Sequence, residues 1–124
     1  MVQNGKKVLV VDDEPHLIRS LTFVLKKEGY DIDSAVDGEE ALEKIRRLKP
    51  NLVFLDVMMP KKNGYEVCQE VKKDPGLSGV YVIMLTAKGQ EADKAKAYES
   101  KADEFISKPF SPVGIVTRVK DLLK

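Results

Sequence analysis

Two kinds of sequence period alternate along the 124 residues, and this alternation constrains the fold more than any other feature of the chain. Short runs rich in β-branched residues predict buried strands, and stretches with apolar residues three or four positions apart predict helices. The predicted strands are residues 7–11, 31–36, 51–55, 80–85 and 104–107. The predicted helices follow them at residues 17–25, 41–48, 64–73, 91–100 and 113–123. This succession of strand–helix units predicts an α/β domain with a parallel sheet that carries helices on both faces.

The composition narrows the class of protein. A chain that is 43% hydrophobic and 33% charged is typical of a globular protein, and we expect residues 1–124 to form a single domain. The net charge of +1 gives no reason to expect nucleic acid or an acidic membrane surface as a partner. No apolar run approaches the roughly 20 residues of a membrane helix. Cys68 is the only cysteine, which excludes an intrachain disulfide and is compatible with a reducing cytoplasm.

Polar side chains stand where the predicted strands end. The carboxyl ends of parallel strands meet at one edge of the sheet, where α/β folds bind their ligands. In chain order the residues at these ends are Asp12, Asp13, Glu14, Asp56, Thr86, Ala87 and Lys108. The second strand contributes only Asp37, which we expect to cap the helix that begins near Gly38. The sequence therefore predicts one polar site built from four of the five strands.

The residue types at this edge indicate a particular chemistry. Carboxylates that face one crevice repel each other and raise some of their pKa values. A hard divalent cation such as Mg²⁺ relieves that repulsion and takes oxygen ligands. The hydroxyl of Thr86 and the ammonium of Lys108 suit a phosphoryl group next to such a cation. A carboxylate can also be the nucleophile that becomes an aspartyl phosphate.

Four segments at these strand ends carry a resemblance to a known family. VLVVDDE, LDVMMPKKNG, MLTAK and ISKPF, in this order and spacing, resemble the receiver domain of two-component response regulators, from about Lys7 to Leu123. The resemblance implies a flavodoxin-like, doubly wound sheet of five parallel strands in the order 2-1-3-4-5 with five helices. It implies a cytoplasmic signalling domain, and not an enzyme beyond catalysing its own phosphotransfer and slow dephosphorylation. A sensor histidine kinase or phosphotransfer protein would supply the phosphoryl group, and a downstream output protein or domain would respond.

The resemblance also implies roles for individual residues. Asp56 would be the phosphoacceptor, and Mg²⁺ would be bound directly by Asp13, Asp56 and the carbonyl of Met58, with Asp12 acting through water. The phosphoryl oxygens would be held by Thr86, Lys108 and the amides near Val57 and Ala87. Thr86 and the aromatic Phe105 would form the conformational switch. The peptide between Lys108 and Pro109 is usually cis in the family.

The face that the resemblance assigns to output consists of the fourth helix, the fifth strand and the fifth helix. Dimerisation of two copies through this face is possible. The predicted helix at 91–100 has alanines but no Leu, Ile or Val, so we expect it to be loosely anchored. Neither nucleic acid nor a membrane is expected to contact this domain directly.

Two other functions compete with the receiver interpretation. A Mg²⁺-dependent phosphohydrolase also forms an aspartyl phosphate, but such enzymes usually carry a second acid two residues after the nucleophile, where this chain has Met58. They also tend to have a cap domain. A flavin or nucleotide binder on the same fold needs a phosphate loop rich in Gly, Ser or Thr after the first strand. The acidic loop at residues 12–14 would repel a phosphate in the absence of a metal.

Several residues have a structural interpretation. His16 is expected at a solvated helix position and Cys68 in the core. Of Met58 and Met59, one should lie in the core and the other at the mouth of the site. Lys101 stands where the family often has Gly, so a positive φ is expected there.

Loop lysines and the residues that flank the site complete the set of predictions. Lys61 and Lys62 are expected to be solvated. Met58 and Lys88 lie two residues after Asp56 and Thr86, where the family admits the water that hydrolyses the phosphate. The thioether of Met58 cannot orient such a water, and the charged ammonium of Lys88 cannot act as a base, so the phosphorylated state should be long-lived.

Overall fold

The computed structural model describes residues 5–59, 61–86 and 99–123 of the chain. The elements in chain order are β1 Lys7–Val11, α1 Pro15–Lys27, β2 Asp31–Ala35, α2 Gly38–Leu48, β3 Leu52–Asp56, α3 Gly64–Lys73, a 3₁₀ turn at Pro75–Leu77, β4 Tyr81–Thr86, β5 Glu104–Ser107 and α5 Pro112–Leu122. The order and type of these elements confirm the alternation of strands and helices predicted from the sequence.

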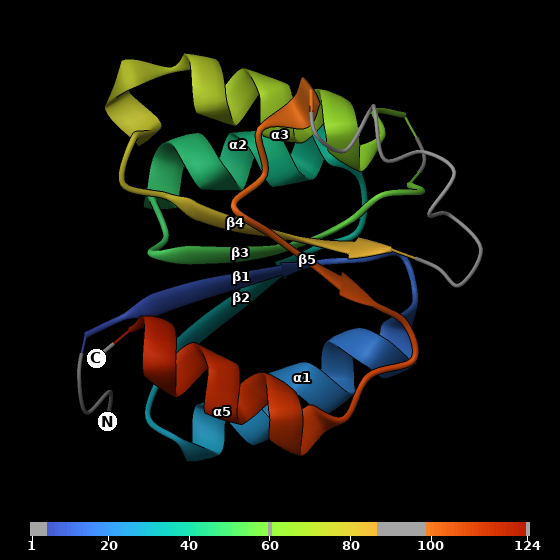
Figure 1. Ribbon diagram of the computed structural model, residues 1–124, viewed down its shortest axis with the longest axis vertical. Coiled ribbons are helices and arrows are strands. Elements are labelled where there is room, and N and C mark those ends of the chain that lie inside the picture. The colour runs from blue at the N-terminus through green and yellow to red at the C-terminus, as the bar shows by residue number, and fades with distance from the viewer. Residues whose placement is uncertain (1–4, 60, 87–98, 124) are drawn as a thin grey trace.

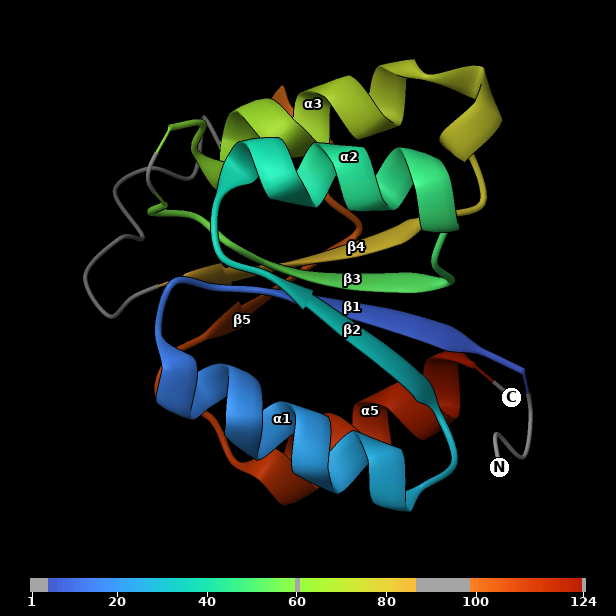
Figure 2. The ribbon, with the colours of Figure 1, turned by 180° about the vertical axis from the view of Figure 1, so that it is seen from behind.

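The strands form one parallel sheet in the order β2-β1-β3-β4-β5. Helices α1 and α5 cover one face of the sheet, and α2 and α3 cover the other, as Figures 1 and 2 show from opposite sides. The predicted doubly wound, flavodoxin-like architecture is therefore confirmed. All strands run in the same direction, so their carboxyl ends meet at one edge.

Alternating side chains of the strands build a separate apolar layer on each face, because successive side chains of a strand point to opposite sides. Val8 and Val10 of β1 pack toward α1 and α5, and Leu9 and Val11 pack toward α2 and α3. Every residue of β3 is buried. The central strands thus hold the carboxyl edge of the sheet in a fixed position between two packed layers.

The boundaries of two central strands differ from the prediction by one residue. Strands β3 and β4 continue to Asp56 and Thr86, where 51–55 and 80–85 were predicted. The pairing of Asp56 with Leu85 and of Thr86 with Ser107 extends the parallel ladder by one step. Polar residues can end a strand as paired members, which the apolar pattern alone does not reveal.

The helix count differs from the prediction because of the segment at 91–100. Residues 91–98 of this predicted helix lie outside the described residues, and Glu99 and Ser100 are helical. Within the described ranges there are four α-helices, whereas five were predicted for the whole chain. The predicted turn after α3 is a short 3₁₀ helix, in which the Asp74 carboxylate accepts a hydrogen bond from the Gly76 N–H at 2.9 Å.

Local predictions on single residues are mostly confirmed. The carboxylate of Asp37 accepts a hydrogen bond from the Glu40 N–H at 2.8 Å and so caps α2. Cys68 is fully buried, His16 is exposed on α1, and Lys101 has a φ of 62°.

Of the two adjacent methionines, one packs against the core and the other is exposed, as expected. Met59 packs against the core beneath α2 and α3, whereas the side chain of Met58 is 64% exposed.

No helix in the three described ranges is both long and apolar enough to cross a membrane.

Candidate functional site

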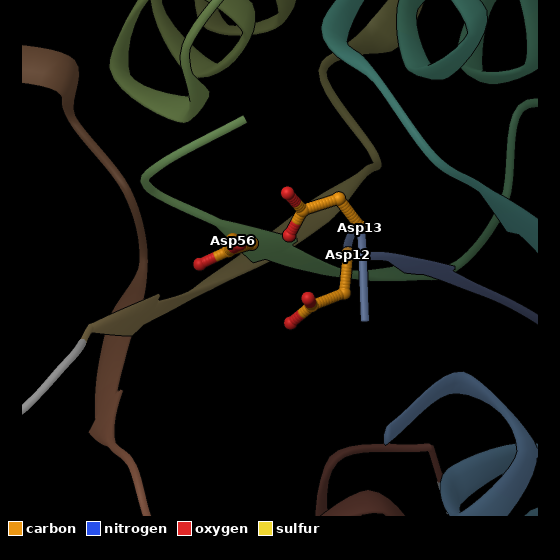
Figure 3. Close-up of side chains that lie close together, drawn as sticks. All are labelled: Asp12, Asp13 and Asp56. Atoms are coloured by element: carbon orange, nitrogen blue, oxygen red, sulfur yellow. The ribbon is translucent and has the colours of Figure 1, made fainter. Parts of the chain in front are cut away.

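Three aspartates come together at the carboxyl edge of the sheet because β1 and β3 are neighbours. Val11 pairs with Leu55 in the parallel ladder, so the residues that follow each of them end side by side. One carboxylate oxygen from each of Asp12, Asp13 and Asp56 lies within 4.8 Å of the others. Figure 3 shows these side chains at the ends of the two strands with their carboxylates close together. The structure thus assembles the acidic cluster that the sequence predicted.

The backbone fixes this cluster at its β1 end. The Asp12 N–H donates to the Ala35 carbonyl of β2 at 3.1 Å, and the Glu14 N–H donates to Oδ1 of Asp12 at 2.9 Å. Asp12 is fully buried, Asp56 is 6% exposed, and Asp13 faces solvent. The site therefore has a buried floor and an open side at Asp13.

Lys108 is the cation that faces these acids in the described part of the chain. Its Nζ lies 2.8 Å from Oδ2 of Asp12, 3.4 Å from Oδ1 of Asp56 and 3.7 Å from Oε1 of Glu14. Its backbone N–H donates to the Thr86 carbonyl at 2.7 Å, which ties the end of β5 to the end of β4. The peptide between Lys108 and Pro109 is cis, as the resemblance implied.

Burial and the excess of carboxylates over ammonium groups shift the pKa values of Asp56 and Lys108. Burial, followed by repulsion from Asp12 and Asp13, raises the pKa of Asp56 from 3.8 to about 6, although Lys108 opposes the shift. Burial alone would lower the pKa of Lys108. Its hydrogen bond to Asp12 and its attraction to Asp56 and Glu14 outweigh that effect, and the pKa of Lys108 is raised. One ammonium thus faces more carboxylates than it can neutralise.

A hard divalent cation fits this arrangement. The three clustered ligand atoms are carboxylate oxygens, the donor type that Mg²⁺ and Ca²⁺ prefer. A second positive charge would also remove the repulsion that raises the pKa of Asp56. The donor set and the charge excess therefore both favour a metal site at Asp12, Asp13 and Asp56.

The other predicted residues occupy different places around this cluster. Thr86 is half-buried at the end of β4, next to the backbone of Lys108. The Val57 N–H donates to the Leu85 carbonyl at 3.2 Å, so it already has a partner in this conformation. Phe105 lies in β5 opposite Met84 and is 41% exposed. Ala87 and Lys88 lie outside the described residues.

Two charged networks have no counterpart in the sequence analysis. Arg118 of α5 binds Glu104 of β5 through two guanidinium nitrogens, and the Tyr81 hydroxyl donates to the same carboxylate at 3.0 Å. On the opposite face of the sheet, Lys62 forms an ion pair with Glu70 of α3. The prediction that Lys62 is merely solvated was therefore wrong. These pairs join residues 8 to 23 positions apart, and no short sequence period marks them.

Comparison with known proteins identifies the family. The model of the response regulator receiver domain matches residues 8–120, and the chain belongs to this family. It is 49% identical over 121 residues to the probable transcriptional regulator ycf27 of Cyanophora paradoxa, covering 98% of this chain and 49% of that protein. It is 45% identical over 120 residues to the alkaline phosphatase synthesis transcriptional regulatory protein PhoP of Bacillus subtilis, covering 97% and 49%.

A solved structure supports the same assignment. The chemotaxis response regulator CheY4 of Vibrio cholerae superposes with a TM-score of 0.87 at 28% identity, over 96% of this chain and 99% of that one. The chain spans about half the length of the curated relatives that it matches. It is thus a receiver domain of a two-component response regulator, with the family's fold.

The raised pKa of Asp56 predicts how stability depends on pH. An acid that binds its proton more tightly in the folded state makes the free energy of unfolding fall as pH rises, here from about 4 to about 6. Without divalent metal, Asp56→Asn should be more stable than the wild type above pH 7 by about 1–3 kcal/mol. The difference should shrink as pH falls through 6 and vanish below about pH 3, where the carboxyl is protonated in both the folded and the unfolded state. Urea unfolding in EDTA across this range measures it.

The control for this measurement is Asp121→Asn, which removes an exposed carboxylate at the far end of α5. It should leave the pH profile of the wild type unchanged. An Asp56→Asn variant that is less stable than the wild type at pH 7.5 would contradict the idea that this carboxylate is held against repulsion.

Proposed function

We propose that this receiver domain accepts a phosphoryl group on Asp56 in a Mg²⁺-dependent reaction and relays a signal through a change of its surface. The observation that supports the proposal most strongly is the placement of the Asp56 carboxylate. It is nearly buried, it lies beside two other carboxylates, and it faces the Lys108 ammonium at 3.4 Å. A nucleophile and a fixed positive charge are thus within reach of one incoming group.

The donor in this proposal is a phosphohistidine of a sensor kinase or phosphotransfer protein. A carboxylate oxygen of Asp56 attacks phosphorus, so that an O–P bond forms and the N–P bond of the donor breaks. The electron pair of the broken bond stays on the imidazole nitrogen. Lys108 offsets negative charge on the transferred group, and the Thr86 hydroxyl donates a hydrogen bond to it. Positioning and charge stabilisation supply most of the rate in such transfers.

The metal would be held by the residues that the resemblance implies, namely Asp13, Asp56 and the carbonyl of Met58, with Asp12 acting through water. When bound, Mg²⁺ supplies positive charge that offsets the phosphoryl oxygens and the acids. The amides near Val57 and Ala87 are proposed to hold further oxygens. For Val57 this requires its N–H to be shared with, or released from, the Leu85 carbonyl.

The donor has an open approach on the α1 side of the site. A groove of about 470 Å³ runs beside Lys108 between the start of α1 and the segment that follows β5. Its lining combines apolar Leu17 and Phe110 with polar Glu14. We propose that the partner that carries the phosphohistidine docks over this groove, which brings its imidazole to Asp56.

The proposed output surface is the face that includes β5 and α5. Thr86 would move toward the phosphoryl group, and Phe105, which is 41% exposed, would turn inward. Such a switch needs two states with different contacts. Glu104 of β5 and Arg118 of α5 form a charged pair on this face. The same face is also the proposed surface for a homodimer. The resemblance also assigns the helix predicted at 91–100 to this face, but residues 91–98 lie outside the described residues.

The wider setting is also part of the proposal. We infer that residues 1–124 act as one receiver domain in the cytoplasm, and that an output protein or a further domain carries the response. The domain itself is not expected to contact DNA or membrane. PhoP of Bacillus subtilis is described as a transcriptional regulatory protein. A transcriptional output is therefore one candidate for this chain.

Phosphorylation of Asp56 can be tested with acetyl phosphate and Mg²⁺. We expect one phosphoryl group per chain, mapped to Asp56 by mass spectrometry and absent from Asp56→Asn. The rate should rise with pH around the pKa of about 6 at low Mg²⁺, because only the ionised carboxylate is a nucleophile. Saturating Mg²⁺ should move this midpoint to lower pH, because the cation favours the ionised form. His16→Gln is the control and should behave as the wild type. Phosphate on His16 would overturn the assignment.

Met58 should prolong the phosphorylated state. Its thioether is a weak acceptor and cannot orient a water for attack on the Asp56 phosphate, and its side chain, two residues after Asp56, is 64% exposed. In Met58→Asn, decay after removal of the donor should be several-fold faster than in the wild type. Lys88→Glu should act in the same direction, although Lys88 lies outside the described residues.

The matched control for Met58 is Phe23→Asn, which places the same polar group at an exposed apolar position on α1. Decay in this variant should equal that of the wild type. Fast decay in the wild type, or equal rates in all the variants, would mean that these side chains do not control water access.

A further inference from the structure

The first residue of α2 touches the loop between β3 and α3 through its backbone. Gly38 is buried, and a Cβ atom added to it would lie 2.1 Å from the Lys62 carbonyl oxygen and 2.6 Å from the Lys62 Cβ. Contacts shorter than about 3 Å are not tolerated between such atoms, so any other residue must displace the loop. Helices α2 and α3 lie side by side on this face of the sheet (Figure 2).

A second close approach connects the same loop to the phosphoacceptor strand. A Cβ added to Gly64, the first residue of α3, would lie 2.2 Å from the Asp56 carbonyl oxygen. The Gly64 N–H also donates to the Val57 carbonyl at 2.8 Å. Gly38 contacts Lys62, and two residues further on Gly64 contacts Asp56. A displacement at the start of α2 would therefore be transmitted to Asp56 through two backbone contacts, the first at Lys62 and the second at Gly64.

Charged side chains hold the loop against both helices. Lys61 has a φ of 69°, a left-handed conformation that is unfavourable for lysine. Its Nζ lies 3.7 Å from Asp37 and 3.8 Å from Glu39, at the start of α2. Lys62 pairs with Glu70 of α3. The loop is thus fixed on both sides by groups that do not themselves reach the acidic cluster.

We propose that Gly38 is a positioning residue for the phosphoacceptor site. Its missing side chain lets α2 support Lys62, and through Gly64 this support sets where the Asp56 and Val57 backbone lies. This inference rests on the proposed function, since its consequence is the correct geometry for Mg²⁺ binding and phosphoryl transfer. Misplacement of a reacting group by about 1 Å can cost up to 100-fold in rate.

The test compares Gly38→Ala with Gly79→Ala, because a Cβ at Gly79 meets nothing within 4 Å. In metal-free Gly38→Ala, the backbone amide shifts of Asp56, Val57 and Gly64 should change. The Mg²⁺ dissociation constant, from titration followed by NMR, should rise about tenfold. Gly79→Ala should match the wild type in both. A folded Gly38→Ala with wild-type shifts and Mg²⁺ affinity would overturn the inference.

Two further variants keep the test decisive if Gly38→Ala does not fold. Lys62→Met and Glu70→Gln both break the Lys62–Glu70 ion pair and change the net charge in opposite directions. Glu70→Gln also removes the pair between Glu70 and Arg46. Loss of positioning predicts weaker Mg²⁺ binding in both variants. Opposite changes would mean that charge alone acts, and no change would mean that this ion pair does not affect the site. Either result would overturn the inference. If the wild type binds Mg²⁺ and becomes phosphorylated, and these variants bind Mg²⁺ as tightly as the wild type, only the positioning role is refuted. If the wild type neither binds Mg²⁺ nor becomes phosphorylated, the proposed function is refuted as well.

Discussion

The arrangement at the sheet edge depends on one ammonium group that is shared among several carboxylates. Lys108 contacts Asp12, Asp56 and Glu14, and Asp13 completes the acidic cluster from the solvent side. Burial strengthens these interactions, because fewer water molecules are present to screen them. The fold must therefore hold like charges together, and burial together with this repulsion raises the pKa of Asp56.

The rest of the molecule provides the rigidity that this requires. Strand β3 is buried along its whole length, and the apolar layers on both faces of the sheet fix the direction in which it ends. The glycine contacts at the starts of α2 and α3 fix the loop that follows it. A buried acid on a flexible loop would relax toward solvent and lose its repulsion. Here the scaffold prevents this, and the strain is available to favour binding of a cation or a phosphoryl group.

Much of the fold and of the site was predictable, because both depend on short-range patterns. The apolar runs marked the strands, and the residues that follow them had to meet at one edge, so Asp12, Asp13, Asp56 and Lys108 were predicted together. The exact strand ends were not predictable, because the pairing of Asp56 with Leu85 is a property of the ladder. The pair formed by Lys62 and Glu70 depends on how the loop between β3 and α3 lies against α3, and neither residue differs in sequence from an ordinary solvated one. The close approach of Gly38 to Lys62 was not predictable either, because a glycine can occur at the start of a helix without any close contact to another segment.

The acids at the sheet edge carry more negative charge than Lys108 can balance, and we propose that a divalent cation removes the excess. Calorimetric titration of Mg²⁺ into the protein, repeated in buffers of different ionisation enthalpy, counts the protons released on binding. At pH 6, near the pKa of Asp56, binding should release roughly half a proton, and above pH 8 it should release almost none. Binding with no proton release at pH 6, or no binding at either pH, would contradict the account.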